Sequence, residues 1–204
     1  MNVKESGELS AGRRAMSTWP NRVTLLRFAA VPVLFVLSST GKPTAFITCL
    51  VLALATDVLD GFLARRMGLV SEFGARLDTF ADLAIYIALP ICAWRLWPEL
   101  LSREIGFVVV AVLSYALPVL AGLTKYGRVA AYHTWSAKLA AVVMAVTVIP
   151  FLAFQIVVPF RFATAVFALA GIENIAITVL LPEWIPNVKS IFHALRIKER
   201  LGRE

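Results

Sequence analysis

The chain has 204 residues, of which 59% are hydrophobic and 16% are charged, and its mean hydropathy is +0.79. These values lie far from those of a soluble domain and predict an integral membrane protein in which short loops join apolar spans. The net charge of +7 suits anchoring to anionic lipid, whereas the scattered basic residues form no aromatic-interleaved stripe of the kind that binds nucleic acid.

Six apolar segments follow a polar N-terminal stretch, and each is long enough for one crossing of about 20 residues. We expect spans near residues 22–39, 43–64, 75–97, 104–124, 134–154 and 160–181, with breaks at proline or polar clusters that include Pro159. The predicted fold class is therefore an all-α integral membrane protein, with one six-helix domain over residues 22–181. Residues 1–21 are expected to form a cytoplasmic or interfacial segment, and residues 182–204 a basic amphipathic interfacial tail.

Basic residues predict the orientation of these spans. If both termini are cytoplasmic, fifteen of the 20 Lys and Arg residues fall in cytoplasmic segments, four fall on the other face, and Arg27 lies inside the first span. An excess of Lys and Arg marks the cytoplasmic loops of membrane proteins. We therefore expect a multi-pass protein of the cell membrane, with both termini and the loop between the second and third spans in the cytoplasm.

Four aspartates lie between residues 56 and 86, in sequence that is otherwise apolar. An ionised carboxylate near hydrocarbon costs at least about 2.5 kcal/mol, so four of them need a local reason. At 100° per residue, Asp57 and Asp60 share one face of a predicted helix, and Asp78 and Asp82 share a face of the next. A short turn at 66–73 makes these helices antiparallel neighbours, so the two pairs can converge. Oxygen ligands without Cys or His predict Mg²⁺ or Mn²⁺ rather than zinc.

Small residues accompany the aspartates on these faces. Gly61 and Ala64 follow Asp60 at helical spacing, and Gly74 precedes Asp78 by four residues. Side chains this small leave a hollow beside the predicted metals. Arg65, which borders the hollow, is placed to meet a phosphate.

The whole pattern resembles the signature of the CDP-alcohol phosphotransferases, integral-membrane enzymes that make phospholipid head groups. It matches every fixed position of that signature: Asp57-x2-Asp60-Gly61-x2-Ala64-Arg65-x8-Gly74-x3-Asp78-x3-Asp82. The resemblance implies an enzyme of phospholipid biosynthesis that transfers the phosphatidyl group of CDP-diacylglycerol to an alcohol and releases CMP. It also implies a homodimer among membrane lipids.

The same resemblance assigns roles to the residues of the signature. It implies that Asp57, Asp60 and Asp78 bind two divalent ions, Mg²⁺ or Mn²⁺, with Asp82 also near the second. Asp82 would be the general base that takes the acceptor's hydroxyl proton. The nucleotide and its phosphates would lie against a pocket of small residues and one arginine: Gly61, Ala64, Arg65 and Gly74.

The start of the first span, Pro20-Asn21-Arg22-Val23-Thr24-Leu25-Leu26-Arg27, resembles an opening found in many members of that family, Pro-Asn-x-Leu-Thr-x2-Arg. Val23 stands where leucine is usual. The resemblance places Asn21 and Thr24 at the nucleotide and Arg27 toward the site. A capped helix start with a snorkelling arginine is the structural alternative.

The acceptor is predicted from basic residues around the start of the fifth span. Arg128 and Lys138 are the candidates for holding an anionic group on the alcohol, with lipid anchoring as the alternative. Glycerol 3-phosphate is the first choice, because the opening resembles the phosphatidylglycerophosphate synthases, and inositol phosphate, serine and phosphatidylglycerol stay open. His133 is expected to bond a helix start, while Glu173 and Asn174 form an intramembrane polar pair without an assigned role.

Two other classes of protein share parts of this pattern. A prenyltransferase of the UbiA type also combines membrane helices, Asp-x2-Asp and Mg²⁺, but its second aspartate cluster lies far downstream, whereas 17 residues separate Asp60 from Asp78 here. A non-enzymatic transporter would scatter its charged residues or show internal repeats, and the sequence has neither feature.

Overall fold

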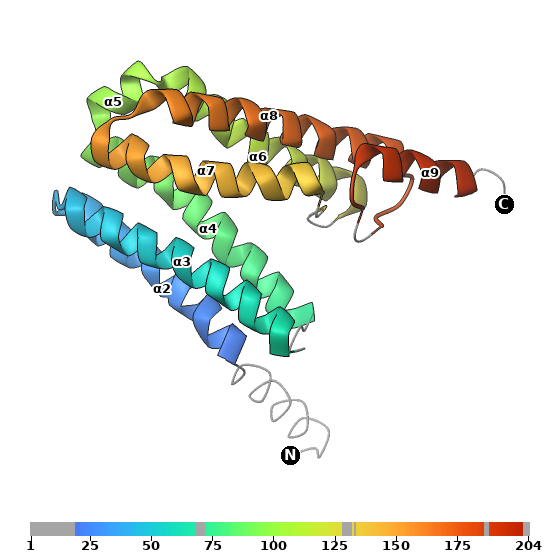
Figure 1. The fold of residues 1–204 in the computed structure, drawn as a ribbon, viewed down its shortest axis with the longest axis horizontal. Coiled ribbons are helices and arrows are strands. Elements are labelled where there is room, and N and C mark those ends of the chain that lie inside the picture. Colours follow the sequence, from blue (N-terminus) through green and yellow to red (C-terminus); the bar gives the residue numbers. More distant parts are fainter. Residues whose placement is uncertain (1–18, 68–71, 128–131, 133, 186–187, 202–204) are drawn as a thin grey trace, which may run out of the picture. The chain divides into compact units, whose positions relative to one another are not determined.

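The computed structural model describes residues 19–67, 72–127, 132, 134–185 and 188–201, and every regular element in these ranges is a helix (Figure 1). Side chains are described for residues 27–56, 80–127, 132, 134–185 and 188–200. The helices are α2 (Trp19–Ser39), α3 (Pro43–Met67), α4 (Glu72–Leu96), α5 (Pro98–Arg103), α6 (Ile105–Tyr126), α7 (Trp135–Phe154), α8 (Val157–Leu180) and α9 (Ile191–Leu201).

Long helices occupy all six segments in which we expect spans. In the described part of the chain, α6, α7 and α8 are each long and apolar enough to cross a membrane. The apolar stretches found in α2 and α3 are shorter, Arg27–Ser39 and Pro43–Thr56, because only described residues enter them. The all-helical membrane class is thus supported, and a total of six spans stays a prediction.

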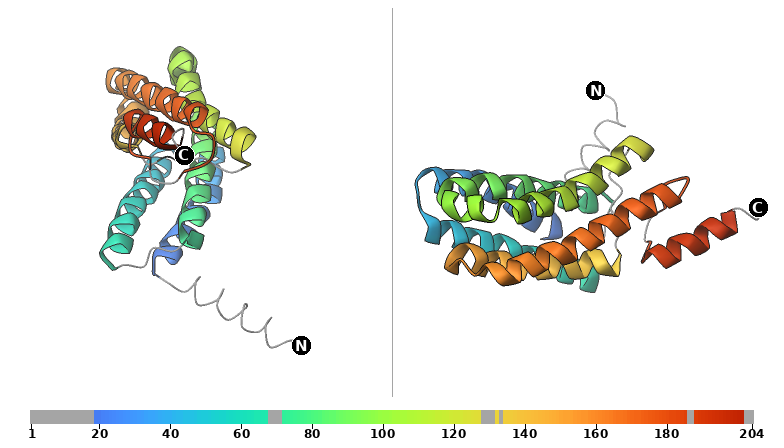
Figure 2. Two further views of the ribbon diagram at one scale, coloured as in Figure 1. Left: turned by 90° about the vertical axis from the view of Figure 1, so that its right-hand side faces the viewer. Right: turned by 90° about the horizontal axis from the view of Figure 1, so that it is seen from above.

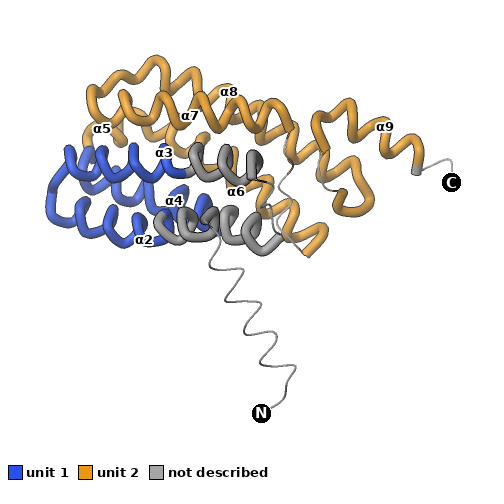
Figure 3. The backbone as a smooth tube through the Cα atoms, turned by 60° about the horizontal axis from the view of Figure 1, so that its bottom comes forward, with its two compact units in different colours: residues 1–98 blue, residues 99–204 orange. Residues whose placement is uncertain are grey.

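The chain divides into two compact units, residues 1–98 and 99–204 (Figure 3). In the first unit, α2 packs against both α3 and α4. Figure 1 shows α3 running opposite to α2 and α4. Leu34 of α2, Leu50 of α3 and Cys92 of α4 are fully buried. Ala81 and Ala88 are also buried in α4, and such small side chains allow close approach of α2.

In the second unit, α8 packs against α6, α7 and α9. Gly171 permits the approach of α8 to α6, because a Cβ at this position would lie 2.5 Å from the backbone oxygen of Ser114. The rings of Phe151 and Phe160 stack 4.0 Å apart where α7 turns into α8. Large apolar side chains such as Val142, Val146 and Phe162 remain exposed on the helices, as in a surface that faces lipid.

The break between α7 and α8 differs from the sequence-based expectation. Pro159 does not mark it, since α8 begins at Val157 and holds Pro159 in its first turn, where a missing N–H costs no helical hydrogen bond. The break lies instead at Gln155, whose φ of 56° is left-handed and whose conformation ends α7. Gly127 ends α6 in the same way, with its N–H bonded to the oxygen of Leu123 at 3.0 Å.

The C-terminal tail folds back on the end of α8 before it becomes helical at Ile191. Five buried residues join the loop, α8 and α9 in one cluster: Tyr132, Ile177, Leu181, Val188 and Ala194. Figures 1 and 2 show α9 running in about the same direction as α8, and not across it. One face of the amphipathic tail is therefore used inside the protein.

Candidate active site

The backbone places the signature on two helices. Asp57 and Asp60 belong to α3, and Asp78 and Asp82 belong to α4, with the break between Met67 and Glu72 inside the turn expected at 66–73. The side chain of Asp82 is described. Those of the other predicted metal and nucleotide residues lie outside the described set: Asn21, Thr24, Asp57, Asp60, Gly61, Ala64, Arg65, Gly74 and Asp78.

Asp82 is paired with an arginine from the first helix. The Nη1 of Arg27 in α2 donates to Oδ1 of Asp82 at 2.5 Å, across 55 residues of sequence. The arginine side chain is 1% exposed, whereas the aspartate side chain is 48% exposed. The predicted base is thus held from the protein side by a buried guanidinium, while part of its surface stays open.

The pairing follows from the packing of α2 on α4. A buried guanidinium among apolar residues costs several kcal/mol unless an opposite charge and hydrogen bonds compensate it. Ala81, the neighbour of Asp82, is fully buried and small, so the two helices approach closely enough for contact. The resemblance placed Arg27 toward the site, and the structure places it against Asp82, the last aspartate of the signature.

Buried positions in α3 and α4 recur with the spacing of one helix face. They are Phe46, Leu50 and Ala53 in α3, and Ala81, Ile85, Ala88 and Cys92 in α4, where Ala93, next to Cys92, is also buried. The same steps of three and four residues lead on to positions 57 and 60 of α3, and back to positions 78 and 74 of α4. Helical periodicity therefore predicts that three of the aspartates lie on the inward faces of these helices.

The predicted metal cluster rests mostly on side chains outside the described set. Among the side chains that are described, no three His, Cys, Asp or Glu residues come together as a metal-binding group. Asp82, the described member, offers a half-exposed carboxylate. Four carboxylates are the hard oxygen donors that Mg²⁺ and Mn²⁺ prefer, so the residue types of the signature fit the predicted ions.

The predicted acceptor residues are only partly described. Arg128 and His133 lie outside the described residues. Lys138 is exposed in the first turn of α7, with its Nζ 5.3 Å from the ring centre of Trp135. This lysine therefore keeps an ammonium group accessible at the end of α7 that follows residue 133.

Glu173 and Asn174, which sequence reasoning left without a role, lie where three helices meet. The Glu173 carboxylate accepts a hydrogen bond from the Ser136 hydroxyl of α7 and, at 3.0 Å, one from the backbone N–H of Ile191 at the start of α9. The Oδ1 of Asn174 is buried and has no hydrogen-bond partner in the described part of the chain. Glu173 of α8 thus joins α7 and α9 to α8 through its two hydrogen bonds.

Lys125 also has a structural role that sequence reasoning missed. Its Nζ donates to the backbone oxygens of Thr178, Val179 and Leu181 at 2.8, 3.0 and 2.8 Å. These carbonyls end α8, and the last turn of a helix leaves such oxygens without partners. The sequence signal for this role lies at the end of α8, because Ile177 to Leu181 contain no cationic side chain that could bond the last carbonyls of the helix. A cation from another segment is then required.

The sequence profile described as "CDP-alcohol phosphatidyltransferase" matches residues 17–180. A "Probable phosphatidylglycerophosphate synthase" of Mycobacterium tuberculosis is 32% identical over 157 residues, which cover 71% of this chain and 69% of that relative. A "CDP-diacylglycerol–glycerol-3-phosphate 3-phosphatidyltransferase" of Cereibacter sphaeroides is 34% identical over 61% of this chain and 62% of its own length.

A shorter match has a higher identity and covers about a third of the chain. The "CDP-diacylglycerol–glycerol-3-phosphate 3-phosphatidyltransferase 2" of Arabidopsis thaliana is 47% identical over 68 residues, which are 32% of this chain and 29% of that relative. The chain thus spans less than a third of the length of this plant relative. No solved structure matches the chain.

Proposed function

This chain belongs to the CDP-alcohol phosphatidyltransferase family, and we propose that it transfers the phosphatidyl group of CDP-diacylglycerol to glycerol 3-phosphate and releases CMP. The observation that carries the proposal is the signature on α3 and α4, whose last aspartate, Asp82, is held at the α2–α4 contact by Arg27 at 2.5 Å. Family membership decides against the prenyltransferase and transporter alternatives.

The reaction is a displacement at the phosphorus that bears the diacylglycerol. The acceptor hydroxyl oxygen forms a bond to this phosphorus, its proton passes to the Asp82 carboxylate, and the bond to the CMP oxygen breaks. Asp57, Asp60, Asp78 and Asp82 would hold two divalent ions, Mg²⁺ or Mn²⁺. Such ions, when bound, neutralise the pyrophosphate and stabilise the departing CMP.

The remaining residues bind and orient. Arg27 is a positioning residue, because its hydrogen bond to Oδ1 restricts the rotation of the carboxylate that accepts the proton. The nucleotide and its phosphates would lie against the small residues and basic group of the signature, together with two polar residues of α2: Asn21, Thr24, Gly61, Ala64, Arg65 and Gly74.

We further propose six membrane spans with both termini and the active site in the cytoplasm. The helices α2, α3 and α4 have 21, 25 and 25 residues, or about 31 to 38 Å at 1.5 Å per residue, which is enough to cross hydrocarbon about 30 Å thick. The excess of basic residues in the segments assigned to the cytoplasm supports this orientation. A homodimer is proposed from the family resemblance.

Glycerol 3-phosphate as the acceptor is supported by the names of the relatives and by the exposed ammonium group of Lys138. Lys138 and Arg128 would hold the phosphate of the acceptor. If they do, Lys138→Ala raises the KM for glycerol 3-phosphate about tenfold or more while the KM for CDP-diacylglycerol changes little, since a charged hydrogen bond is worth about 1.5 to 3 kcal/mol.

One experiment tests the proposal directly. The purified full chain is supplied with CDP-diacylglycerol, Mg²⁺ or Mn²⁺, and separately with glycerol 3-phosphate, inositol phosphate, serine or phosphatidylglycerol. We expect CMP release and a phosphatidyl product with glycerol 3-phosphate. Turnover with another alcohol alone would replace the acceptor and keep the chemistry, whereas no CMP release with any of them would contradict the activity itself.

A further inference from the structure

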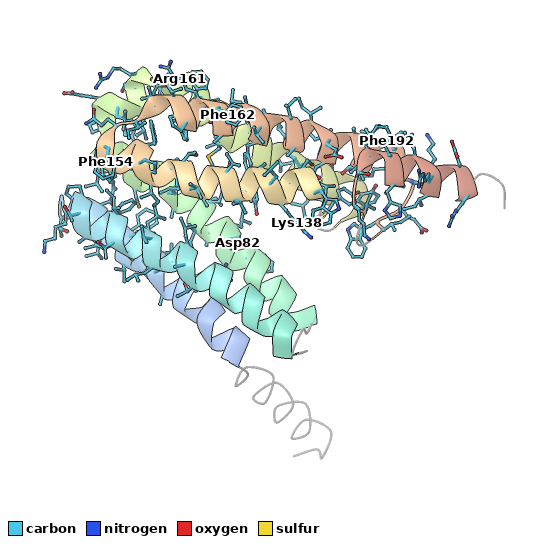
Figure 4. The ribbon with its side chains drawn as sticks, in the orientation of Figure 1. Asp82, Lys138, Phe154, Arg161, Phe162 and Phe192 are labelled. Atoms are coloured by element: carbon cyan, nitrogen blue, oxygen red, sulfur yellow. The ribbon has the colours of Figure 1, made fainter. Side chains whose placement is uncertain are left out.

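The two ends of the second unit differ in charge. At the end where α6 begins and α7 passes into α8, the charged residues balance: Glu99 and Glu104 against Arg103 and Arg161. At the end that carries α9, the described residues include six basic and three acidic side chains: Lys125, Lys138, Lys189, Arg196, Lys198 and Arg200 against Glu173, Glu183 and Glu199. Figure 4 shows Lys138 and Phe192 toward this second end, and Phe154 and Arg161 toward the first.

The start of α9 lies beside the last turns of α8. The bond from the Ile191 N–H to Glu173 sets this level, since Glu173 precedes the end of α8 by about two turns. The first turn of α9 therefore lies beside the last two turns of a helix apolar enough to span a membrane, and its later residues continue beyond the end of that helix. If α8 crosses the bilayer, this first turn lies at the depth of the membrane–water interface.

The outer face of α9 is apolar at this level. Ile191, Ala194 and Ile197 pack inward, whereas Phe192 is 72% and Leu195 41% exposed. At 100° per residue, Arg196 lies next to Phe192 on one side of this apolar pair, and Lys198 lies beyond Leu195 on the other. Glu199, one turn after Leu195, is the acidic residue of the same face.

An exposed tryptophan extends this surface to α7. Trp135 is 71% exposed, and its backbone N–H donates to the oxygen of Lys189 at 3.2 Å, which joins the start of α7 to the start of α9. Tryptophan and other aromatic side chains at the ends of spans favour the headgroup level of a bilayer, where one side is apolar and the other is wet.

We propose that these residues form a lipid-binding surface, the α9 belt, defined by Trp135, Lys189, Phe192, Leu195 and Arg196. Phe192, Leu195 and Trp135 enter the boundary between headgroups and acyl chains, and Lys189 and Arg196 bind the phosphates of anionic lipids. Basic residues near an anionic leaflet are attracted to it, so charge complementarity selects an anionic surface. The proposal depends on α8 crossing the membrane and is independent of the reaction catalysed.

The depth of the α9 belt can be measured in the full chain reconstituted in vesicles. The two free cysteines, Cys49 and Cys92, are replaced by Ala, and a nitroxide is attached at Phe192→Cys. Its collisions with oxygen, which concentrates in lipid, are compared with its collisions with a water-soluble nickel chelate. Glu183→Cys, in the exposed loop before α9, is the matched aqueous control, and Leu195→Cys serves as a second probe if labelling at 192 perturbs the fold.

Vesicles of phosphatidylcholine alone are compared with vesicles containing phosphatidylglycerol or phosphatidylserine. We expect the oxygen-to-nickel collision ratio at 192 to exceed that at 183 several-fold, to rise further with either anionic lipid, and to lose that rise in the Lys189→Gln, Arg196→Gln variant. Equal collision ratios at 192 and 183 would overturn the proposal. A collision ratio at 192 that is the same in neutral and in anionic vesicles would also overturn it. Dipolar broadening between labels at 192 would overturn it as well, by assigning the surface to contact between two copies.

Discussion

Replacing Arg27 with Met isolates the ion pair between α2 and α4. Methionine keeps most of the length and apolar volume of the side chain, so the change removes the charge and its hydrogen bonds while filling the same space. A hydrogen bond to a charged group contributes about 1.5 to 3 kcal/mol, and breaking a fully buried pair costs about 3 to 5. Because the Asp82 side chain is 48% exposed and stays accessible to water, the lower range applies.

We therefore expect Arg27→Met to lower the free energy of unfolding by about 1.5 to 3 kcal/mol, measured by equilibrium unfolding in mixed micelles. Arg95→Met is the matched control in the same unit, since Arg95 is exposed and donates to Ser39 at 3.0 Å, and its loss should stay within about 0.5 kcal/mol. A double-mutant cycle with Asp82→Asn should give a coupling of at least about 1 kcal/mol.

The same variants separate a positioning role from a purely structural one. If Arg27 orients the proton-accepting carboxylate, Arg27→Met lowers kcat far more than it changes the KM for CDP-diacylglycerol, and Arg27→Lys restores part of kcat. Additive effects of the Arg27 and Asp82 substitutions on stability would refute the pairing. A loss of kcat that merely follows the loss of folded protein would refute the positioning role.

Four more changes test other parts of the structure. Asp57→Ala should abolish CMP release and weaken Mn²⁺ binding measured by titration of the purified chain; retained activity would remove Asp57 from the metal site. Lys125→Met should lower the unfolding free energy by about 1.5 kcal/mol through loss of the α8 cap, while Lys198→Met, at an exposed position, should not. Gly171→Ala should cost about 1 to 3 kcal/mol, because its Cβ meets the Ser114 backbone, whereas Gly106→Ala, with open space around it, should be neutral or stabilising. Hydrogen bonds from Arg161, opposed by burial, hold the pKa of Glu104 below its ordinary 4.5. The ion pair therefore stabilises the fold fully above pH 4.5, and this stabilisation is lost as the pH falls through the lowered pKa. Unfolding midpoints measured between pH 6 and 3 should show this loss, and Glu104→Gln should remove that part of the pH dependence.

Most helix ends were predictable because local chemistry determines them. Polar turns such as Ser39 to Pro43, and left-handed positions such as Gly127, interrupt apolar sequence at points where no other interaction competes. Pro159 misled the prediction because proline is a breaker inside a helix but is tolerated in a first turn. Gln155, which does end α7 through a positive φ, carries no such signal in its residue type.

The contacts between helices could not be predicted from local pattern. Arg27 and Asp82 are 55 residues apart, and their pairing depends on α2 packing against α4, which the hydrophobic periodicity of either helix leaves open. Lys125 and Glu173 are likewise polar residues whose partners lie on other helices. For the signature the situation is reversed: eight spaced residues predicted the family and the chemistry, because a reaction demands particular residue types at particular spacings.

These contacts affect how mutations near the acceptor must be interpreted. Lys125 and Lys138 are both basic residues near the proposed cytoplasmic end of the second unit, and substitution of either can reduce activity. Lys125, however, holds the carbonyls that end α8, so its loss acts through the amount of folded protein and lowers activity toward every substrate alike. Among the described contacts, the exposed Lys138 caps no helix, and its ammonium group lies over the ring of Trp135. Only a selective rise in the acceptor's KM at Lys138, with stability unchanged, would therefore be evidence for phosphate binding.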